Sequence, residues 1–537
     1  MSHFVRPLQA IESYPSDLLI NSLVDTATER VARSFSRRLG YLHESKVVRE
    51  ITNKWLSLGG RLGDLTKLSS IEREIFTNIA PVNQQATLDA LSRAIKDSKF
   101  VSTQNHQRHY FARIARSLAY EPEYFDQAIS ILIQFALAEP EDFRNDSTRD
   151  MLKSLFCCHL SGTNTLAIQR VLIVKKLLES GNIANQKLGL SILNSALEAT
   201  HFSSHYEFDF GARTRGYGWS PKSQEEACDW FRPFLEITKN YGMNVSGTGH
   251  QARMVIARAF RGLWSIGLID ELSSASESLR NIDGFPEGWH AIRKTLHFDK
   301  SKLSELSISE LKKLEVVMTP KDLQNTIRAK ILSSDPYDIE FDDDDDANKW
   351  SSKVQRAAED AQEIGKIATE NHELLKSMIP ELLRNVTTNH VINFGIGVGK
   401  HSQNIKEIIA LIKAEVKIKD LSQLNLSFMR GIIIGWSQAD NKATTDFLDE
   451  ALMDETWAER FPYFQFSLDL DQESHSRLMQ SIALGKAPAS QYRSLGYGRA
   501  TDPLTVHQIS TLIDSIALMN MNGLEIAINV LQMVVMV

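Results

Sequence analysis

Amphipathic helical segments follow one another along most of this chain, from about Ile71 to the C-terminus, with short polar turns between them. Five of these segments carry clear apolar stripes: Phe125, Ala128, Ile129, Leu132, Phe135 and Ala136; Leu188, Ile192 and Ala196; Leu323, Ile327 and Ile331; Ala357, Ala361, Ile364 and Ala368; and Ile405, Ile408, Ile409, Ile412 and Val416. An apolar stripe at this spacing must be buried against another helix. The row of stripes therefore predicts an all-α fold, an α-solenoid of stacked helical hairpins of the TPR or HEAT type.

The composition is that of a folded protein with no strong preference for polyanions. A chain of 537 residues is too long for one compact core, so several domains or a continuous solenoid are expected. Hydrophobic residues make up 42% and charged residues 24%, which argues against intrinsic disorder. The net charge of −7 argues against broad nucleic-acid binding, because that needs a basic surface.

The composition shifts along the chain and divides it into four parts. Residues 1–60 form an N-terminal helical junction rich in Arg and Lys, whose basic face is either solvated or in contact with a nucleotide-binding neighbour. Residues 61–332 and 351–537 form two helical-repeat segments. Between them, residues 333–350 form an acidic linker, because the consecutive aspartates Asp342–Asp346 repel one another and resist packing.

The second helical-repeat segment ends on an apolar helix, AINVLQMVVMV, without a polar cap. A solenoid normally closes with a repeat whose outer face is polar. We therefore expect a truncated product or one piece of a split gene, which self-associates through this apolar end. The alternative is a last helix that folds back into its own core.

Cysteine usage and hydropathy indicate a cytoplasmic protein. Three cysteines, Cys157, Cys158 and Cys228, are too few for a disulfide framework. The adjacent pair next to His159 lacks the spacing of zinc ligands, so we expect buried helical cysteines and no metal. The N-terminus is not a secretory signal and no stretch reaches the length of a membrane span, so no membrane partner is expected.

A glycine-rich segment at Phe394–Ser402, FGIGVGKHS, looks like a phosphate-binding loop. That loop requires Gly, four residues, and then Gly-Lys-Ser or Gly-Lys-Thr. Here His401 replaces the hydroxyl residue and Phe394 occupies the first glycine position. We predict a glycine-rich turn between helices, no cofactor and no catalytic residues. The alternative is a nucleotide-dependent enzyme that uses the Gly395–Lys400 loop.

Residues 201–221 interrupt the helical pattern with aromatic residues, glycines and arginines. Such residues dominate interaction hot spots, and loops often carry function. The candidate partner-binding residues are Phe208, Phe210, Arg213, Arg215, Tyr217 and Trp219, with a second, smaller patch at Arg493, Tyr497 and Arg499. The alternative for the loop is that its aromatic side chains fill a seam between repeats while Arg213 bonds carbonyl groups. The alternative for the second patch is an inter-helix turn whose arginines pair with neighbouring acids.

Four stretches together resemble the C-terminal half of bacterial signal-transduction ATPases of the STAND class, the antiviral STAND group in particular. They are Trp55–Ile95, beginning WLSLGGRLGDL; Leu155–Arg170, LFCCHLSGTNTLAIQR; Phe208–Phe231, FDFGARTRGYGWSPKSQEEACDWF; and the tail from FMRGIIIGW to LEIAINVLQM. The resemblance implies a helical-repeat region that senses a ligand, often a phage protein, and so releases an N-terminal effector through ATP-dependent oligomerisation.

The chain departs from that family because it has no Walker motifs and no effector domain. The resemblance therefore implies that the NTPase and effector modules act in cis or in trans, and that residues 1–60 are the junction to a winged-helix module or its remnant. The function expected is a non-enzymatic sensor or scaffold that binds a protein ligand, phage-encoded, in antiviral defence. Besides the nucleotide-dependent enzyme, a nucleic-acid-binding helical repeat is the remaining alternative.

Overall fold

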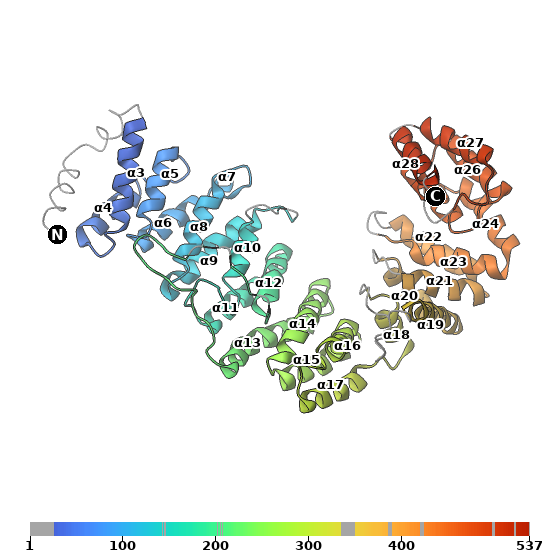
Figure 1. The fold of residues 1–537 in the computed structure, drawn as a ribbon, viewed down its shortest axis with the longest axis horizontal. Helices are drawn as coiled ribbons and strands as arrows, with labels where there is room; N and C mark the ends of the chain where they lie inside the picture. The colour runs from blue at the N-terminus through green and yellow to red at the C-terminus, as the bar shows by residue number, and fades with distance from the viewer. Residues whose placement is uncertain are drawn as a thin grey trace. The chain divides into compact units, whose positions relative to one another are not determined.

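The computed structural model of the chain describes residues 26–141, 143, 147–200, 202–204, 206, 208–333, 350–384, 389–418, 424–496, 500–519 and 522–535. Within these residues every regular element is a helix, and strand-like pairing is limited to two isolated bridges. Most helices pack against partners close to them in the chain, as expected for helical stacking (Figure 1). The all-α prediction is confirmed.

The chain divides into two compact units, and the first spans Met1–Met318. Its helices are α3 (Thr26–Gly40), α4 (Lys46–Leu56), α5 (Ser70–Ile79), α6 (Gln84–Ala94), α7 (Ser98–Val101), α8 (Arg108–Leu118), α9 (Pro122–Leu137), α10 (Thr148–Ser154), α11 (Ala167–Leu178), α12 (Ile183–Ala196), α13 (Gln224–Gly242), α14 (Gly247–Ser265), α15 (Ile269–Asp283), α16 (Pro286–Asp299) and α17 (Glu305–Met318). Helix α8 packs on α9, α11 on α12, and α13 on α14.

Local signals in the sequence account for where several of these helices begin. The Ser69 hydroxyl oxygen caps α5 by accepting from the Glu72 N–H, and the Glu72 carboxylate accepts from the Ser69 N–H, which completes a capping box. Pro122 occupies the first turn of α9, where its missing N–H costs nothing. The six apolar residues predicted to form the α9 stripe are all buried, so that stripe is confirmed.

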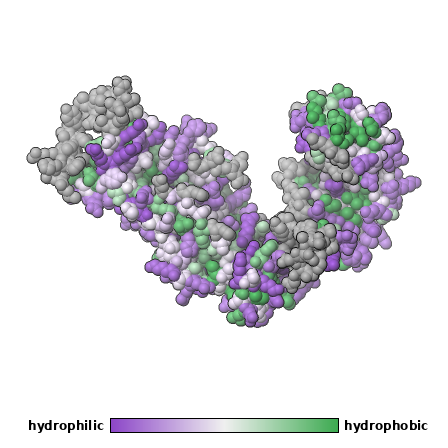
Figure 2. All heavy atoms as spheres, viewed as in Figure 1, coloured by the Kyte–Doolittle hydropathy of each residue, from purple (hydrophilic) through white to green (hydrophobic). Residues whose placement is uncertain are grey.

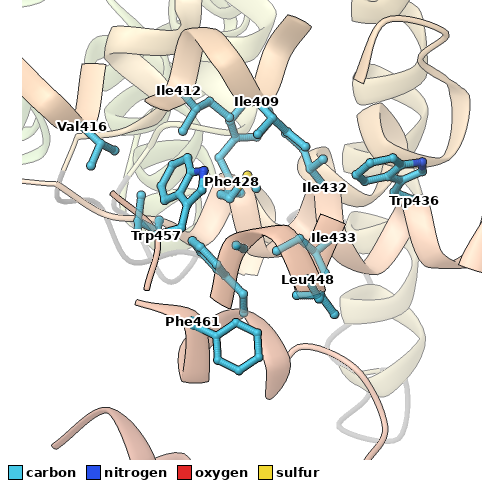
Figure 3. Packing of buried hydrophobic residues seen from close by; sticks show 14 of the residues in the cluster. Ile409, Ile412, Val416, Phe428, Ile432, Ile433, Trp436, Leu448, Trp457 and Phe461 are labelled. Atoms are coloured by element: carbon cyan, nitrogen blue, oxygen red, sulfur yellow. The ribbon is translucent and has the colours of Figure 1, made fainter. Parts of the chain in front are cut away.

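The second unit spans Thr319–Val537. Its helices are α18 (Leu323–Lys330), α19 (Trp350–Glu370), α20 (His372–Leu382), α21 (Asn389–His401), α22 (Ile405–Ile418), α23 (Ser427–Ala439), α24 (Asn441–Met453), α25 (Phe461–Gln465), α26 (Gln472–Leu484), the 3-10 helix η3 (Ala489–Gly496), α27 (Val506–Ala517) and α28 (Gly523–Val535). One apolar core runs through all of them, and Figure 3 shows its part around α22, α23 and α25.

Helix α18 belongs to this second unit, because Ile327 and Ile331 lie in its apolar core. The boundary between the units therefore lies upstream of the predicted linker, and the last part of the predicted 61–332 segment packs with the second unit. The linker itself, including Asp342–Asp346, lies outside the described residues except at its two ends. In the part of the chain that is described, no helix is both long and apolar enough to cross a bilayer.

The glycine-rich segment at Phe394–Ser402 is not a turn, so that prediction was wrong. It forms most of the continuous helix α21, which packs between α19 and α23. A Cβ atom added at Gly397 would fall far inside contact distance of the Gln362 carbonyl oxygen on α19. One added at Gly399 would collide in the same way with the Ile432 carbonyl oxygen on α23.

Helix α23 contributes matching glycines to this contact. A Cβ atom on Gly431 or Gly435 would collide with the backbone of α21, at the carbonyl oxygens of Ile392 and Ile396 respectively. The missing side chains let the two helix backbones approach more closely than Ala would permit. The glycines at Gly395 and Gly399 therefore serve helix packing, since a phosphate loop needs backbone amides that are not already used within a helix.

We predict that Gly397→Ala destabilises the second unit by about 1–3 kcal/mol, the usual cost of overpacking, because the new methyl group meets the α19 backbone. The measurement is urea unfolding followed by circular dichroism. Gly247→Ala is the matched control, since the open position near the start of α14 has no atom within 4 Å of an added Cβ. Equal stability of the two variants would contradict the close approach of α19 and α21.

Candidate protein-binding site

Residues 208–220, here called the return loop, lie in the connection between α12 and α13 but contact segments much earlier in the first unit. The loop can be followed in Figure 1 between these two helices. At its tip, a Cβ on Gly211 would lie 2.9 Å from Pro81, which sits between α5 and α6. The loop therefore spans several helix pairs rather than one hairpin.

The tip of the return loop is a tight turn held to the α5–α6 corner. The Phe210 N–H donates to the Arg213 carbonyl oxygen and the Arg213 N–H donates to the Phe210 carbonyl oxygen, each at 3.2 Å. Gly211 has a φ of +64°, a conformation that favours glycine. The Arg213 Nε donates to the Pro81 carbonyl oxygen at 3.3 Å. Arg213 thus bonds a carbonyl group, as the structural alternative for this loop expects.

Arg215 holds the middle of the loop to the end of α8. Its Nη1 donates to the Ser117 carbonyl oxygen at 2.6 Å, and its guanidinium lies 4.5 Å from the Tyr120 ring and 5.0 Å from the Phe210 ring. The side chain is only 3% exposed, and Glu121 lies 3.8 Å away. Burial lowers the pKa of Arg215 to about 10, so the group remains a cation at neutral pH.

The C-terminal part of the loop is joined to the segment that follows α10. The Trp219 N–H donates to the Thr163 carbonyl oxygen at 2.8 Å, and the Gly162 N–H donates to the Tyr217 carbonyl oxygen at 2.9 Å. The indole of Trp219 stacks on Trp230 of α13, with ring centroids 5.2 Å apart. Backbone and ring contacts together fix the orientation of this part of the loop.

Tyr217 is the most exposed of the six predicted loop residues, with a relative exposure of 64%. Its ring meets the half-buried Phe208 edge to face at 5.4 Å. Phe208 in turn lies 5.5 Å from the guanidinium of Arg116, a buried side chain of α8. The structure pairs Phe208 with Tyr217 and places Phe210 beside Arg213 and Arg215, whereas Trp219 lies apart on Trp230. Of the six residues only Tyr217 is exposed, and the other five are buried or half-buried.

A set of buried arginines, which the residue pattern did not single out as functional, donates to carbonyl groups near the ends of neighbouring helices. Arg170 is fully buried and donates to the carbonyl oxygens of Leu155, at 2.6 Å, and Thr165, at 2.7 Å. Its guanidinium lies 4.6 Å from the Trp230 ring, which the return loop covers through Trp219. The signal was present, because Arg170 occupies a stripe position four residues before the buried Val174.

Arg108 repeats this arrangement in the preceding helix pair. It donates to the carbonyl oxygens of Val101 and Phe135 and to the carboxylate of Glu139, at 2.6 Å. Helix ends leave carbonyl groups without partners, and a buried guanidinium offers five donors to them. Both arginines thus satisfy carbonyl groups near helix ends, and Arg170 also contacts the Trp230 ring on which Trp219 of the return loop stacks.

The second predicted patch is only partly described. Arg493 is exposed on η3, whereas Tyr497 and Arg499 lie outside the described residues. Tyr492 beside it is buried and its hydroxyl lies 2.7 Å from that of Ser481, and burial raises its pKa to about 12. Tyr492 is therefore part of the apolar core. Among the described residues of this patch, only Arg493 faces solvent.

The basic N-terminal segment borders a shallow cavity of about 360 Å³. The cavity is lined by Arg33, Ser34, Arg37, Arg38 and Tyr41 of α3 and the turn that follows it. Glu74 of α5 approaches Arg33 Nε at 2.5 Å and Arg37 Nη2 at 3.6 Å. This carboxylate compensates part of the positive charge, which weakens the attraction of the cavity for anions.

Cys157 and Cys158 lie in the loop after α10, not in a helix, so that part of the cysteine prediction was wrong. Cys158 is buried, Cys157 is half-buried, and both are free thiols. Burial raises the pKa of Cys158 to about 12 and also raises the pKa of Cys157. Across the described residues, no cluster of three or more His, Cys, Asp or Glu residues is placed to hold a metal ion.

We predict that Cys158 resists thiol reagents until the chain unfolds. With a pKa of about 12, on the order of one thiol in ten thousand is ionised at pH 8. Because the folded pKa lies above its usual 9.0, the stability that this thiol contributes is complete below pH 9 and is lost as the pH rises toward 12. Labelling by a chromogenic disulfide at pH 8, with and without urea, checks this, and rapid labelling of Cys158 in the native protein would contradict it.

No protein-family model and no curated protein matches this chain.

Proposed function

We propose that this chain is a non-enzymatic helical-repeat protein, an α-solenoid of the TPR or HEAT type, that binds a protein partner. The binding surface would be the return loop together with the helix ends it crosses. The observation that carries this proposal is the exposure of Tyr217 on a loop whose neighbouring residues are buried, bonded or stacked. An exposed aromatic ring on an ordered loop is a common anchor in interfaces.

The order of the return loop supports binding because it lowers the entropy cost of association. Arg213, Arg215 and Trp219 fix the loop at three places along the first unit. A partner would therefore not have to order the loop when it binds, and more of the contact energy would appear as affinity. The half-buried ring of Phe208 packs edge to face against the ring of Tyr217 and limits its movement.

The resemblance to antiviral STAND proteins supports a narrower proposal about the partner. In that scheme the chain is the cytoplasmic sensor for a phage protein, and the NTPase and effector modules act in cis or in trans. Binding would shift those modules from a resting to an active arrangement, because a ligand favours whichever state it binds more tightly. This narrower proposal depends on the sequence resemblance alone.

The nucleotide-dependent alternative loses its main argument because Gly395–Lys400 lies within α21. The backbone amides there are engaged in a helix, and Gly399 faces the backbone of α23. Saturable binding of magnesium ATP that is abolished by Lys400→Ala would nevertheless restore that alternative. The nucleic-acid alternative predicts affinity that falls steeply with salt, and the net charge of −7 argues against it.

We predict that Tyr217→Ala weakens partner capture at least ~10-fold without loss of helicity, because truncating a hot-spot tyrosine removes contact area and leaves the loop anchors in place. The wild-type protein and the variant would be immobilised and exposed to proteins from phage-infected bacteria, and the captured proteins would be quantified by mass spectrometry.

Tyr110→Ala is the matched control, because it removes another exposed tyrosine ring of the first unit, one on α8. The proposal expects a protein captured by the wild type and by Tyr110→Ala but lost with Tyr217→Ala. A captured protein whose recovery is the same with both variants would remove the return loop as the binding surface.

A further inference from the structure

The last helix carries a row of exposed apolar side chains. On α28, Leu524, Ile528, Leu531 and Val535 are 62%, 55%, 48% and 74% exposed. Their spacing of four, three and four residues places them on one side of the helix, within about one sixth of its circumference. Figure 2 shows hydrophobic side chains gathered over the last helices of the second unit.

This row is not the face by which α28 joins its own unit. Ile526, Ala527 and Val530 are at most 2% exposed, and α28 packs on η3 and α27. One face of the last helix therefore packs into its own core, as the alternative for this helix expects, while the exposed row leaves self-association through the apolar end a prediction. A large exposed apolar surface on a folded unit marks an interaction site.

The order of residues in the row favours pairing with another helix. A spacing of four, three and four residues is the a/d seam of a coiled coil, with Leu524 and Leu531 at d and the β-branched Ile528 and Val535 at a. Leucine at d with Ile or Val at a favours two parallel strands over three or four. The chemistry of the row thus indicates a single parallel partner helix.

The charge on α28 is compatible with a partner identical to itself. Glu525, in the first turn, is the only ionisable residue of this helix. Two copies of the helix therefore meet without rows of like charges across the seam, which would oppose self-pairing. By contrast, α24 has Asp446, Asp449 and Glu450 within two turns, and two copies of such a helix would repel one another.

We propose that α28 of this chain pairs with α28 of a second copy, in parallel about a two-fold axis, so that Leu524, Ile528, Leu531 and Val535 meet their counterparts. A two-fold contact uses the same surface on both copies and closes after two. Four side chains bury less than the ~800 Å² per partner of a typical stable interface, so the dimer forms in the micromolar range. This inference does not depend on the proposed function.

The first test measures the mass of the full chain in solution by light scattering after size exclusion. We expect twice the monomer mass at ~50 µM and dissociation toward the monomer near ~1 µM, as mass action requires. Ile528→Glu places a charge at the centre of the seam and should leave a monomer at both concentrations. Ile528→Gln, a neutral helix former, should raise the dissociation constant at least ~10-fold.

Ile168→Glu is the matched control, since Ile168 on α11 is 62% exposed, close to the 55% of Ile528, and lies in the first unit. It should dimerise like the wild type, and circular dichroism should show equal helicity in all variants. A wild-type chain that is monomeric at ~50 µM, or an Ile528→Glu variant that still dimerises, would overturn the proposal.

The second test concerns the parallel arrangement. In a parallel pair, residues at the same d position lie side by side, so Leu531→Cys should form a covalent dimer under mild oxidation. The wild-type chain is the control, because Cys158 and Cys228 are buried and Cys157 is half-buried. A dimer that does not cross-link through Leu531→Cys, but does so when Leu524→Cys and Val535→Cys chains are mixed, would show an antiparallel pair and contradict the proposal.

Discussion

Each helix of this protein stays folded because a neighbouring helix covers its apolar stripe. Most of the helices are 10 to 20 residues long, a length at which an isolated helix is marginal in water. Burial of apolar surface, worth about 25 cal/mol per Å², therefore has to come from packing between helices. Stacking in chain order satisfies this requirement, and it leaves helix ends and loops at the edge of the stack, where the return loop runs.

Two kinds of residue, glycines and buried arginines, allow neighbouring helices to pack closely. In the second unit, glycines remove side chains where α19, α21 and α23 meet, so that backbone lies against backbone. In the first unit, buried arginines such as Arg108 and Arg170 donate to carbonyl groups at helix ends that packing removes from water. The return loop uses arginines in the same way, because Arg213 and Arg215 donate to the carbonyl oxygens of Pro81 and Ser117.

Patterns that depend on local spacing could be predicted from the sequence. The α9 stripe, the capping box at Ser69 and the break in helical pattern at residues 201–221 all follow from neighbours in the chain. The glycine-rich segment of α21 could not be interpreted in this way. The same residues suit a phosphate loop or a close helix contact, and the choice depends on what α19 and α23 present to them.

In the candidate site too, some features follow from neighbours in the chain and others depend on distant contacts. Residue types singled out the loop at residues 201–221, but they could not separate Arg215, which is bonded beneath the surface, from Tyr217, which projects from it. That separation depends on contacts between residues far apart in the chain, such as Arg213 with Pro81, 132 positions away. No periodicity in a sequence reports a contact at that separation.

Native-state hydrogen exchange can show whether the return loop is an ordered part of the helical stack. Backbone amides of Phe210, Arg213 and Trp219 donate to backbone carbonyl groups, and that of Arg215 donates to the Asp209 carboxylate. We expect these amides to be protected to a degree comparable with those of α8, to which Arg215 bonds the loop. Exchange of the loop within seconds, while α8 stays protected, would show that the loop is not held to the helical stack.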